Sequence, residues 1–174
     1  MNYEQWLAEI PSTITNDALW QTEVYRVSFF LGDLAWYDVS KLSQDRRTLS
    51  LSDQLYRSTG SISANISEGY SRASGKDQAR FYEYALGSAR ESRDWYFKGR
   101  YVLGTDVTTH RLNLLVLIIR SLLKMIPKYR GKYIKEEGVD YQFASSLAEL
   151  LKHIPMPAID APRTTHQDTT NANK

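Results

Sequence analysis

The sequence predicts an all-α protein, and more narrowly an antiparallel, up-down four-helix bundle. Four segments, about residues 17–38, 50–72, 75–103 and 105–126, carry apolar residues at steps of three and four, which is the spacing of one helix face. Short polar or glycine-containing connections separate these segments, and strand patterns are nearly absent. Helices joined by short loops pack as antiparallel neighbours, so a bundle is the predicted architecture.

The first two helices have narrow apolar stripes. Asn16 is the expected N-cap of the first helix, and either Ser50 or Ser52 is expected to begin the second. The stripes consist of Trp20, Val24, Val27, Leu31 and Leu34 in the first helix and of Leu51, Leu55, Ile62 and Ile66 in the second. Each stripe covers one side, so each helix is expected to bury one face.

The third and fourth helices have clear ends. Ser74 and Asp77 have the spacing of a capping box at the start of the third helix, and Gly104 is expected to end it. The fourth helix is expected to begin near Thr105 and to end before Pro127. Their stripes consist of Phe81, Ala85, Ser88, Ser92, Trp95, Gly99 and Val102, and of Leu112, Leu115, Val116, Ile119, Leu122, Leu123 and Ile126.

The fourth helix is apolar over more than one stripe, because Leu114, Leu117 and Ile118 widen its hydrophobic surface. A helix that is apolar over most of its circumference is buried on more than one side. In a bundle of this size, a second subunit is the expected cover for the additional side.

The chain divides around the predicted bundle. Residues 1–16 form an N-terminal segment with a short helical turn near Trp6, and residues 17–128 form the bundle. Residues 129–154 are expected to be a connector with a short amphipathic helix. Residues 155–174, rich in Pro, Thr, Asn and Gln, are expected to be a disordered tail.

Composition narrows the class of protein. The chain has 174 residues and no cysteine, which excludes disulfides and thiolate metal sites. Its beginning lacks the basic and apolar regions of a secretory signal, and the apolar stretch 112–126 is interrupted by Arg120 and Lys124. No membrane association is expected, and the predicted location is cytoplasmic.

Charge is distributed unevenly along the chain. Residues 1–45 have a net charge of −5, residues 46–135 of +10 and residues 136–174 of −3. A basic block of this size can attract phosphate backbones or an acidic partner. The alternative interpretation is that most of these cations form a solvated helix surface.

No enzyme site is evident. His110, His153 and His166 are scattered, and no Glu-x-x-His pair of the kind that holds a di-metal centre in bundles is present. No histidine lies near a candidate serine nucleophile, and no strand precedes a glycine-rich phosphate loop. No cofactor and no metal are expected. A catalytic alternative would require a pocket that collects Glu68, Glu91 and His110.

The middle helices contain polar residues at helical spacing. Asn65, Glu68 and Arg72 follow one another at steps of three and four, as do Ser88 and Glu91 at a step of three. The structural interpretation is a buried or half-buried hydrogen-bond network that fixes helix register, with Arg80 as a candidate partner of Glu68. The functional alternative is a surface for a partner chain or nucleic acid.

Basic residues alternate with aromatic residues on the third helix, and a second basic strip follows the fourth. Guanidinium groups beside flat rings suit phosphate contact and base stacking, whereas the same aromatics could equally belong to the core or a subunit interface. The residues predicted to bind nucleic acid are Arg90, Arg93, Lys98, Arg100, Arg111, Arg120, Lys124 and Lys128.

Three motifs resemble a known family. The segment Asn65-Ile66-Ser67-Glu68-Gly69 resembles the Asn-Ile-Ala-Glu-Gly motif of the four-helix-bundle proteins encoded in intervening sequences of bacterial large-subunit ribosomal RNA genes. Gln54-Leu55-Tyr56-Arg57 resembles the Gln-Leu-x-Arg segment before that motif, which adds Arg57 to the polar set. Gly87-Ser88-Ala89-Arg90-Glu91 is similar to the Gly-Ser-x-x-Glu element of the third helix. Ser67, Ala89 and Ser92 depart from the usual residues and make this face smaller and more polar.

The resemblance covers about residues 17–127 and implies a homopentameric, barrel-like ring without enzymatic activity. The same superfamily includes accessory proteins of diversity-generating retroelements, which bind a reverse transcriptase and nucleic acid through a basic surface. One hypothesis is therefore a non-catalytic, ring-forming nucleic-acid-binding accessory protein that partners a reverse transcriptase. The other is a structural or protein-interaction oligomer without nucleic-acid affinity, in which acids of a neighbouring subunit neutralise the basic block.

Overall fold

The computed structural model describes residues 3–130 and 146–159, and these residues form helices and connections without any strand. The elements in order are α1 (Tyr3–Glu9), α2 (Ser12–Thr15), η1 (Ala18–Gln21), α3 (Glu23–Leu42), η2 (Arg46–Thr48), α4 (Leu49–Tyr70), α5 (Gly75–Leu103), α6 (Thr105–Arg130) and α7 (Leu147–Lys152). The all-α prediction is confirmed.

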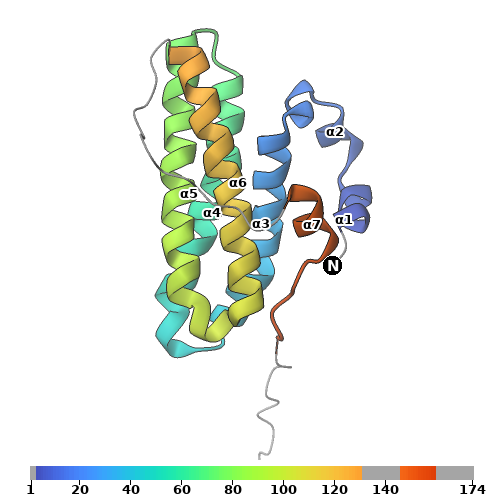
Figure 1. The fold of residues 1–174 in the computed structure, drawn as a ribbon, viewed down its shortest axis with the longest axis vertical. Coiled ribbons are helices and arrows are strands. Elements are labelled where there is room, and N and C mark those ends of the chain that lie inside the picture. Colours follow the sequence, from blue (N-terminus) through green and yellow to red (C-terminus); the bar gives the residue numbers. More distant parts are fainter. Residues whose placement is uncertain (1–2, 131–145, 160–174) are drawn as a thin grey trace, which may run out of the picture.

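The four long helices α3, α4, α5 and α6 lie side by side, and each runs opposite to the one before it (Figure 1). Each packs on the next, and α6 returns to contact α3. The short helices α1, α2 and α7 lie beside α3, and α7 also contacts α6. No helix in the part of the chain that the structure describes is long and apolar enough to cross a membrane.

One continuous hydrophobic core occupies the space between the long helices. Its fully buried side chains include Leu34, Leu55, Ile62 and Leu115 from the predicted stripes, and also Tyr82, which the stripe predicted for the third helix did not contain. Burying a side chain of this size stabilises the fold by roughly 1.5–3 kcal/mol. The apolar periodicity of the sequence therefore accounts for the position of the core.

Gly69 allows α4 and α5 to approach closely. A Cβ atom at this position would lie 2.7 Å from Cε1 and 2.9 Å from Cδ1 of the buried Tyr82 ring, and 3.1 Å from Cβ of Phe81. Contacts below 3.0 Å would require the ring or the helix to move. This geometry gives a packing reason for the glycine that ends the segment Asn65–Gly69.

Gly104 joins α5 to α6. Its φ angle of 83° and ψ angle of 165° lie in a region that is essentially restricted to glycine, and its N–H caps α5 by donating to the carbonyl oxygen of Arg100. At the other end of α5, Ser74 Oγ accepts from the Asp77 N–H at 3.1 Å, as predicted.

The start of the first long helix differs from the prediction. Residues 18–21 form the 3₁₀ helix η1, capped by Asp17 rather than by Asn16, and α3 begins only at Glu23. The Asp17 carboxylate accepts from the Leu19 N–H at 2.8 Å, which satisfies one donor at the start of η1. The Trp20 side chain still packs into the core, so the stripe predicted the burial although it misplaced the helix start.

The end of α6 also differs, because the helix continues through Pro127 to Arg130. Proline removes a single N–H donor, and this loss occurs close to the helix end. The residues beyond it make tertiary contacts: the Tyr129 ring lies 5.4 Å from the Tyr82 ring, and Arg130 forms an ion pair with Glu83 on α5. These contacts stabilise the last turn.

The N-terminal segment packs on α3 through aromatic residues. The Trp6 ring lies 4.7 Å from the Phe30 ring and 6.3 Å from the Trp20 ring, and its Nε1 donates to the Asp33 carboxylate at 2.5 Å. Trp6 is 4% exposed. The segment is thus part of the core, whereas the sequence predicted only a short helical turn there.

The C-terminal segment folds back over α6. Ser146 and Glu149 form a capping box at the start of α7, and Leu150 is buried. The chain then continues to residue 159 with Pro157 buried. The predicted tail, residues 155–174, therefore begins with packed residues, and residues 160–174 lie outside the described part. Most of the predicted connector, residues 131–145, also lies outside it.

Candidate nucleic-acid interface

The polar set on α4 lies mainly at the surface. The Glu68 and Arg72 side chains form an exposed ion pair, and Arg57 lies 3.9 Å from Asp53 on another exposed turn. Asn65 is half-buried and donates from Nδ2 to the carbonyl oxygen of Ser61 at 2.8 Å, within its own helix. The predicted buried or half-buried network between helices is not found among these residues, because Arg57, Glu68 and Arg72 are exposed and the half-buried Asn65 bonds within α4.

The polar residues of α5 also bond locally. Ser88 Oγ donates to the Tyr84 carbonyl oxygen at 3.0 Å, and Glu91 accepts from Trp95 Nε1 at 3.1 Å. Arg80 was predicted to pair with Glu68. Instead it lies 3.8 Å from Asp77 on its own helix, and Glu68 pairs with Arg72. Exposed pairs of this kind contribute about 0–1 kcal/mol each.

The buried polar network lies elsewhere, around Arg111. Its Nε donates to the Asp38 carboxylate at 2.8 Å, and its Nη2 donates to the second carboxylate oxygen at 3.0 Å. Tyr96 donates from its hydroxyl to the same carboxylate at 2.9 Å. Burial and the neighbouring carboxylate raise the pKa of Tyr96 well above its usual value, so its hydroxyl stays protonated as a donor.

Arg111 was predicted to bind nucleic acid, and the structure corrects this prediction. Its side chain is 0% exposed, and it joins α6 to Asp38 on α3. The signal was present in the sequence, since Arg111 lies four residues after Val107 and Asp38 four after Leu34, both on buried stripes. A charge at a stripe position predicts an internal ion pair better than a surface contact.

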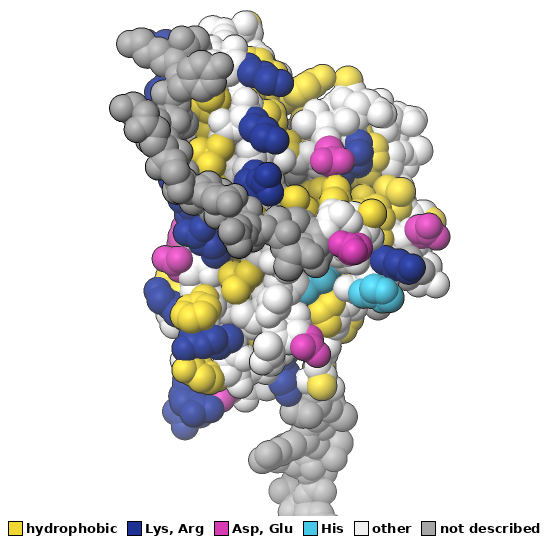
Figure 2. All heavy atoms as spheres, in the orientation of Figure 1, with side chains coloured by type: hydrophobic (Ala, Val, Ile, Leu, Met, Phe, Trp, Pro, Cys, Tyr) yellow, Lys and Arg dark blue, Asp and Glu magenta, His cyan; other side chains and the backbone are white. Residues whose placement is uncertain are grey.

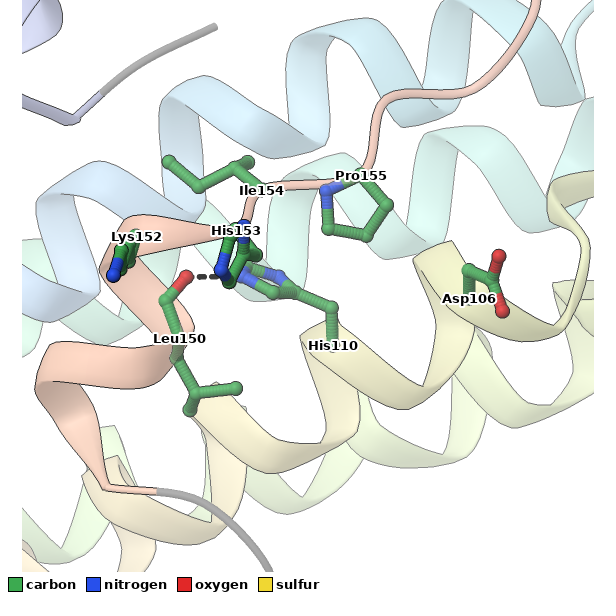
Figure 3. A pocket seen from close by; sticks show the side chains of 7 residues that line it. All are labelled: Asp106, His110, Leu150, Lys152, His153, Ile154 and Pro155. Carbon is green, nitrogen blue, oxygen red and sulfur yellow. Dashed lines mark hydrogen bonds between the residues drawn. The ribbon is translucent and has the colours of Figure 1, made fainter.

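His110 lies beside this network and beneath α7. Its Nε2 donates to the Leu150 carbonyl oxygen at 2.8 Å (Figure 3), and its Nδ1 accepts from Arg111 Nη1 at 2.9 Å. This pattern requires a neutral ring with the proton on Nε2. Burial, together with the Arg111 charge, lowers the pKa of His110 to about 4, although the bond to Leu150 opposes the shift.

The pocket over His110 is lined also by Asp106, Lys152, His153, Ile154 and Pro155 (Figure 3). Neither Glu68 nor Glu91 lines this pocket, so the structure does not bring together the three residues that the catalytic alternative required. Across residues 3–130 and 146–159, no group of three or more His, Asp or Glu side chains could hold a metal ion. The arrangement is that of a hydrogen-bonded joint between α6 and the C-terminal segment.

The other predicted cations lie along the surface of α5 and α6, and we call them the basic row. Figure 2 shows dark blue side chains running over these two helices with few magenta ones between them. Lys98, Lys124 and Lys128 are exposed. The row consists of Arg90, Arg93, Lys98 and Arg100 on α5 and of Arg120, Lys124 and Lys128 on α6, all exposed or half-buried.

Aromatic rings hold part of the basic row in place. The Lys98 ammonium lies 4.3 Å from the centre of the Trp95 ring, and the Arg100 guanidinium lies 4.0 Å from the Phe97 ring and 4.2 Å from the Tyr101 ring. Such contacts orient a cation without neutralising it. Within the described residues, no salt bridge to Arg93, Lys98 or Arg100 is found. These groups can still pair with external anions.

The fold therefore defines an all-helical protein with four long helices and a cation-rich face built from two of them. The family model of the 23S rRNA-intervening sequence protein matches residues 21–126, a range that spans α3, α4, α5 and most of α6. The chain belongs to this family. Comparison with curated proteins and with solved structures gave no match.

Proposed function

We propose that this chain is a non-catalytic protein that binds nucleic acid, with RNA as the favoured ligand, through the basic row. The observation that carries the proposal is the continuous line of cations along α5 and α6, opposed by few carboxylates on that face. Membership in the 23S rRNA-intervening sequence family supports an RNA-associated role.

The row has the physical properties that backbone binding requires. Its cations lie on helices, so the protein backbone needs no ordering when phosphates bind. Each phosphate contact releases condensed counterions, and affinity therefore falls steeply as salt rises. The contacts are to the phosphate backbone of the nucleic acid, so we expect binding along most of the row to depend little on base sequence.

Fluorescence anisotropy with a labelled RNA over a series of salt concentrations tests this proposal. We expect binding at low salt, a steep loss of affinity with added salt, and a slope reduced by about one for each cation removed. Charge reversals Arg93→Glu, Arg120→Glu and Lys124→Glu should each weaken binding. Arg57→Glu is the matched control, because Arg57 is exposed on α4 and outside the row. If the unmodified protein shows no salt-sensitive binding, the proposal fails.

We further propose that the four long helices act as an up-down four-helix bundle and that the protein assembles into a homopentameric ring. The family resemblance supports the ring, and the wide apolar surface of α6 supports association, because Leu112, Val116 and Leu123 stay only partly buried in the single chain. Sedimentation equilibrium should give a mass five times the 20.0 kDa of one chain. A monomer at micromolar concentration would contradict this proposal.

A reverse transcriptase of a diversity-generating retroelement is the protein partner that the resemblance implies. The basic row supports this role, since a protein that holds template RNA beside a polymerase needs a surface for phosphates. Purification of the tagged protein with the reverse transcriptase of such an element, before and after nuclease treatment, tests a direct contact. Loss of the enzyme under gentle, nuclease-free conditions would contradict it.

The second candidate function is a structural oligomer without nucleic-acid affinity. Exposed aromatic residues on α3 and α4 favour it, because Trp36 is 59% exposed and its ring lies 6.0 Å from that of Tyr56, which is 45% exposed. In this case polynucleotide would leave sedimentation unchanged. High salt would separate the subunits, since the acidic residues 1–45 of one chain would neutralise the row of the next.

A further inference from the structure

A pocket lies where α5 ends and α6 begins, next to the Gly104 joint. Its α5 side is formed by Phe97, Arg100 and Tyr101. Its α6 side is formed by Thr105, Thr108, Thr109 and Leu112. The residues come from two helices held at a fixed distance by packing along their length, so the pocket is preformed.

Two aromatic rings stand open on one side of this pocket. Phe97 is 54% exposed and Tyr101 is 83% exposed, and they are four residues apart on one face of α5. Neighbouring exposed rings of this size form an apolar surface of the kind that can mark a binding site. The core does not need them, since α5 packs inward through Tyr96 and Leu103.

Arg100 is fixed between these rings. Its guanidinium lies over both ring faces, its Nη1 donates to the Phe97 carbonyl oxygen at 2.6 Å and its Nη2 donates to the Tyr101 hydroxyl at 2.7 Å. The group is thus pre-oriented, and the described residues contain no carboxylate paired with it. An anion that binds here meets a cation whose ordering cost has already been met.

Thr108 adds a polar group to the lining. Its side chain is buried, and its Oγ1 has no hydrogen-bond partner among residues 3–130 and 146–159. A buried hydroxyl without a partner is uncommon, and leaving it unsatisfied costs roughly 1–3 kcal/mol. This oxygen is closed to solvent, so the polar groups that a ligand in the pocket can reach are those of Arg100 and the exposed Thr105 and Thr109.

We propose that this pocket binds an unpaired nucleobase of single-stranded nucleic acid, which stacks on Phe97 or Tyr101 while Arg100 contacts the adjoining phosphate. A flat, polar-edged ring beside an anionic group matches the exposed surfaces of the two aromatic rings and the fixed guanidinium between them. The inference rests on the proposed function and deepens it, because it adds a preference for single strands to a surface that otherwise contacts only phosphates.

The position of the pocket favours nucleic acid over an apolar peptide. Arg100 belongs to the basic row, and Lys98 and Arg93 lie on the same helix within two turns. A chain of phosphates that follows the row from α6 to the end of α5 therefore arrives at the pocket. An apolar peptide would gain contact with the two rings but would find no charge partner there.

Binding of a single-stranded oligonucleotide and of a duplex of the same length tests the proposal. Phe97→Ala and Tyr101→Ala should each weaken single-strand binding roughly 10-fold, as expected for loss of one stacked base, and should leave duplex binding and the salt slope unchanged. Tyr101→Phe should retain binding because it keeps the ring. Tyr84→Ala is the matched control, since Tyr84 is 52% exposed on α5 and outside the pocket.

The outcomes separate this inference from the proposed function. If both oligonucleotides bind with a steep salt dependence and neither alanine variant changes single-strand affinity, the pocket does not bind a base. The proposal that the basic row binds nucleic acid would still be supported. If no oligonucleotide binds the unmodified protein, both proposals fail. If the alanine variants change the sedimentation coefficient instead of the affinity, the rings form a protein interface, and the inference is overturned.

Discussion

Arg111 and Arg100 lie on consecutive helices, three turns apart along the chain, and have opposite environments. Arg111 is fully buried and bonded to Asp38 through two nitrogens, whereas Arg100 rests on two exposed rings without a carboxylate partner among the described residues. The first cation fixes how α3 and α6 meet, and the second is available to an external anion. The same residue type therefore has a structural or a binding role according to its burial.

Substitution of the buried Arg111 is expected to have the largest effect on the free energy of unfolding. Arg111→Ala should lower the free energy of unfolding by about 3–5 kcal/mol, because the Asp38 carboxylate would stay buried without its partner. Urea unfolding monitored by circular dichroism measures the loss. The double variant Asp38→Leu and Arg111→Met should be less destabilised than Arg111→Ala, since it leaves no uncompensated charge. A loss below about 1 kcal/mol for Arg111→Ala would contradict the burial of the pair.

Two glycines allow a second comparison, between a tightly packed position and an open one. Gly69→Ala should destabilise the protein by about 1–3 kcal/mol, because the new methyl group meets the Tyr82 ring. Gly87→Ala is the control, since a Cβ there has no neighbour within 4 Å. It should stabilise the helix by roughly 0.5–1 kcal/mol. Equal effects of the two variants in urea unfolding would show that the α4–α5 approach is not tight.

His110 makes the buried region sensitive to pH. Its pKa is about 4 in the folded protein and about 6.5 when unfolded, so between these values the unfolded chain binds more protons and stability falls as pH falls. We expect a loss of about 2 kcal/mol between pH 7.5 and pH 5 from this residue.

The comparison variant for this pH effect is His110→Gln, which does not titrate. Its free energy of unfolding should change less between the same two pH values, and the difference between the two proteins isolates the histidine. A profile parallel to that of the unmodified protein would show that His110 is accessible to water and protons in the folded state.

The exposed side should show the smallest effects on stability. Arg93→Glu or Lys124→Glu should change the free energy of unfolding by less than about 0.5 kcal/mol, because neither side chain is in the core. The same variants are expected to weaken RNA binding. A thermal melt of each variant measures its stability, and fluorescence anisotropy measures its RNA affinity, so the two effects can be separated. Strong destabilisation by either variant would mean that these cations belong to an interface that a single chain does not show.

Most of the fold could be predicted from the sequence because it follows from local patterns. The stripes predicted α4 and α5 closely, and Ser74, Asp77 and Gly104 marked helix ends through the conformations they favour. The end of α6 could not be placed, because long-range contacts of Tyr129 and Arg130 sustain a helix that Pro127 alone would end. Tertiary contact overrode local propensity there. The start of α3 was misplaced for a local reason, since Asp17 rather than Asn16 provides the cap and the capped turn is a 3₁₀ helix.

The candidate site was less predictable than the fold. The basic pattern placed the cations on α5 and α6 but did not by itself separate Arg111 from its neighbours; only its position on the buried stripe does. The pocket at Phe97 also could not be found, since it requires residues of two helices to meet at the Gly104 joint. Helical spacing assigns a residue to a face, and only packing decides what lies opposite that face.

By itself, the sequence determined an all-helical chain, the caps at the two ends of α5 and the uneven distribution of its charge, because these depend on residues close together along the chain. The tertiary structure alone decided that Asp38, Tyr96 and Arg111 share a buried network and that Arg100 lies between two open rings. Those arrangements join residues far apart in sequence or depend on which side of a helix is covered, and no local pattern encodes either.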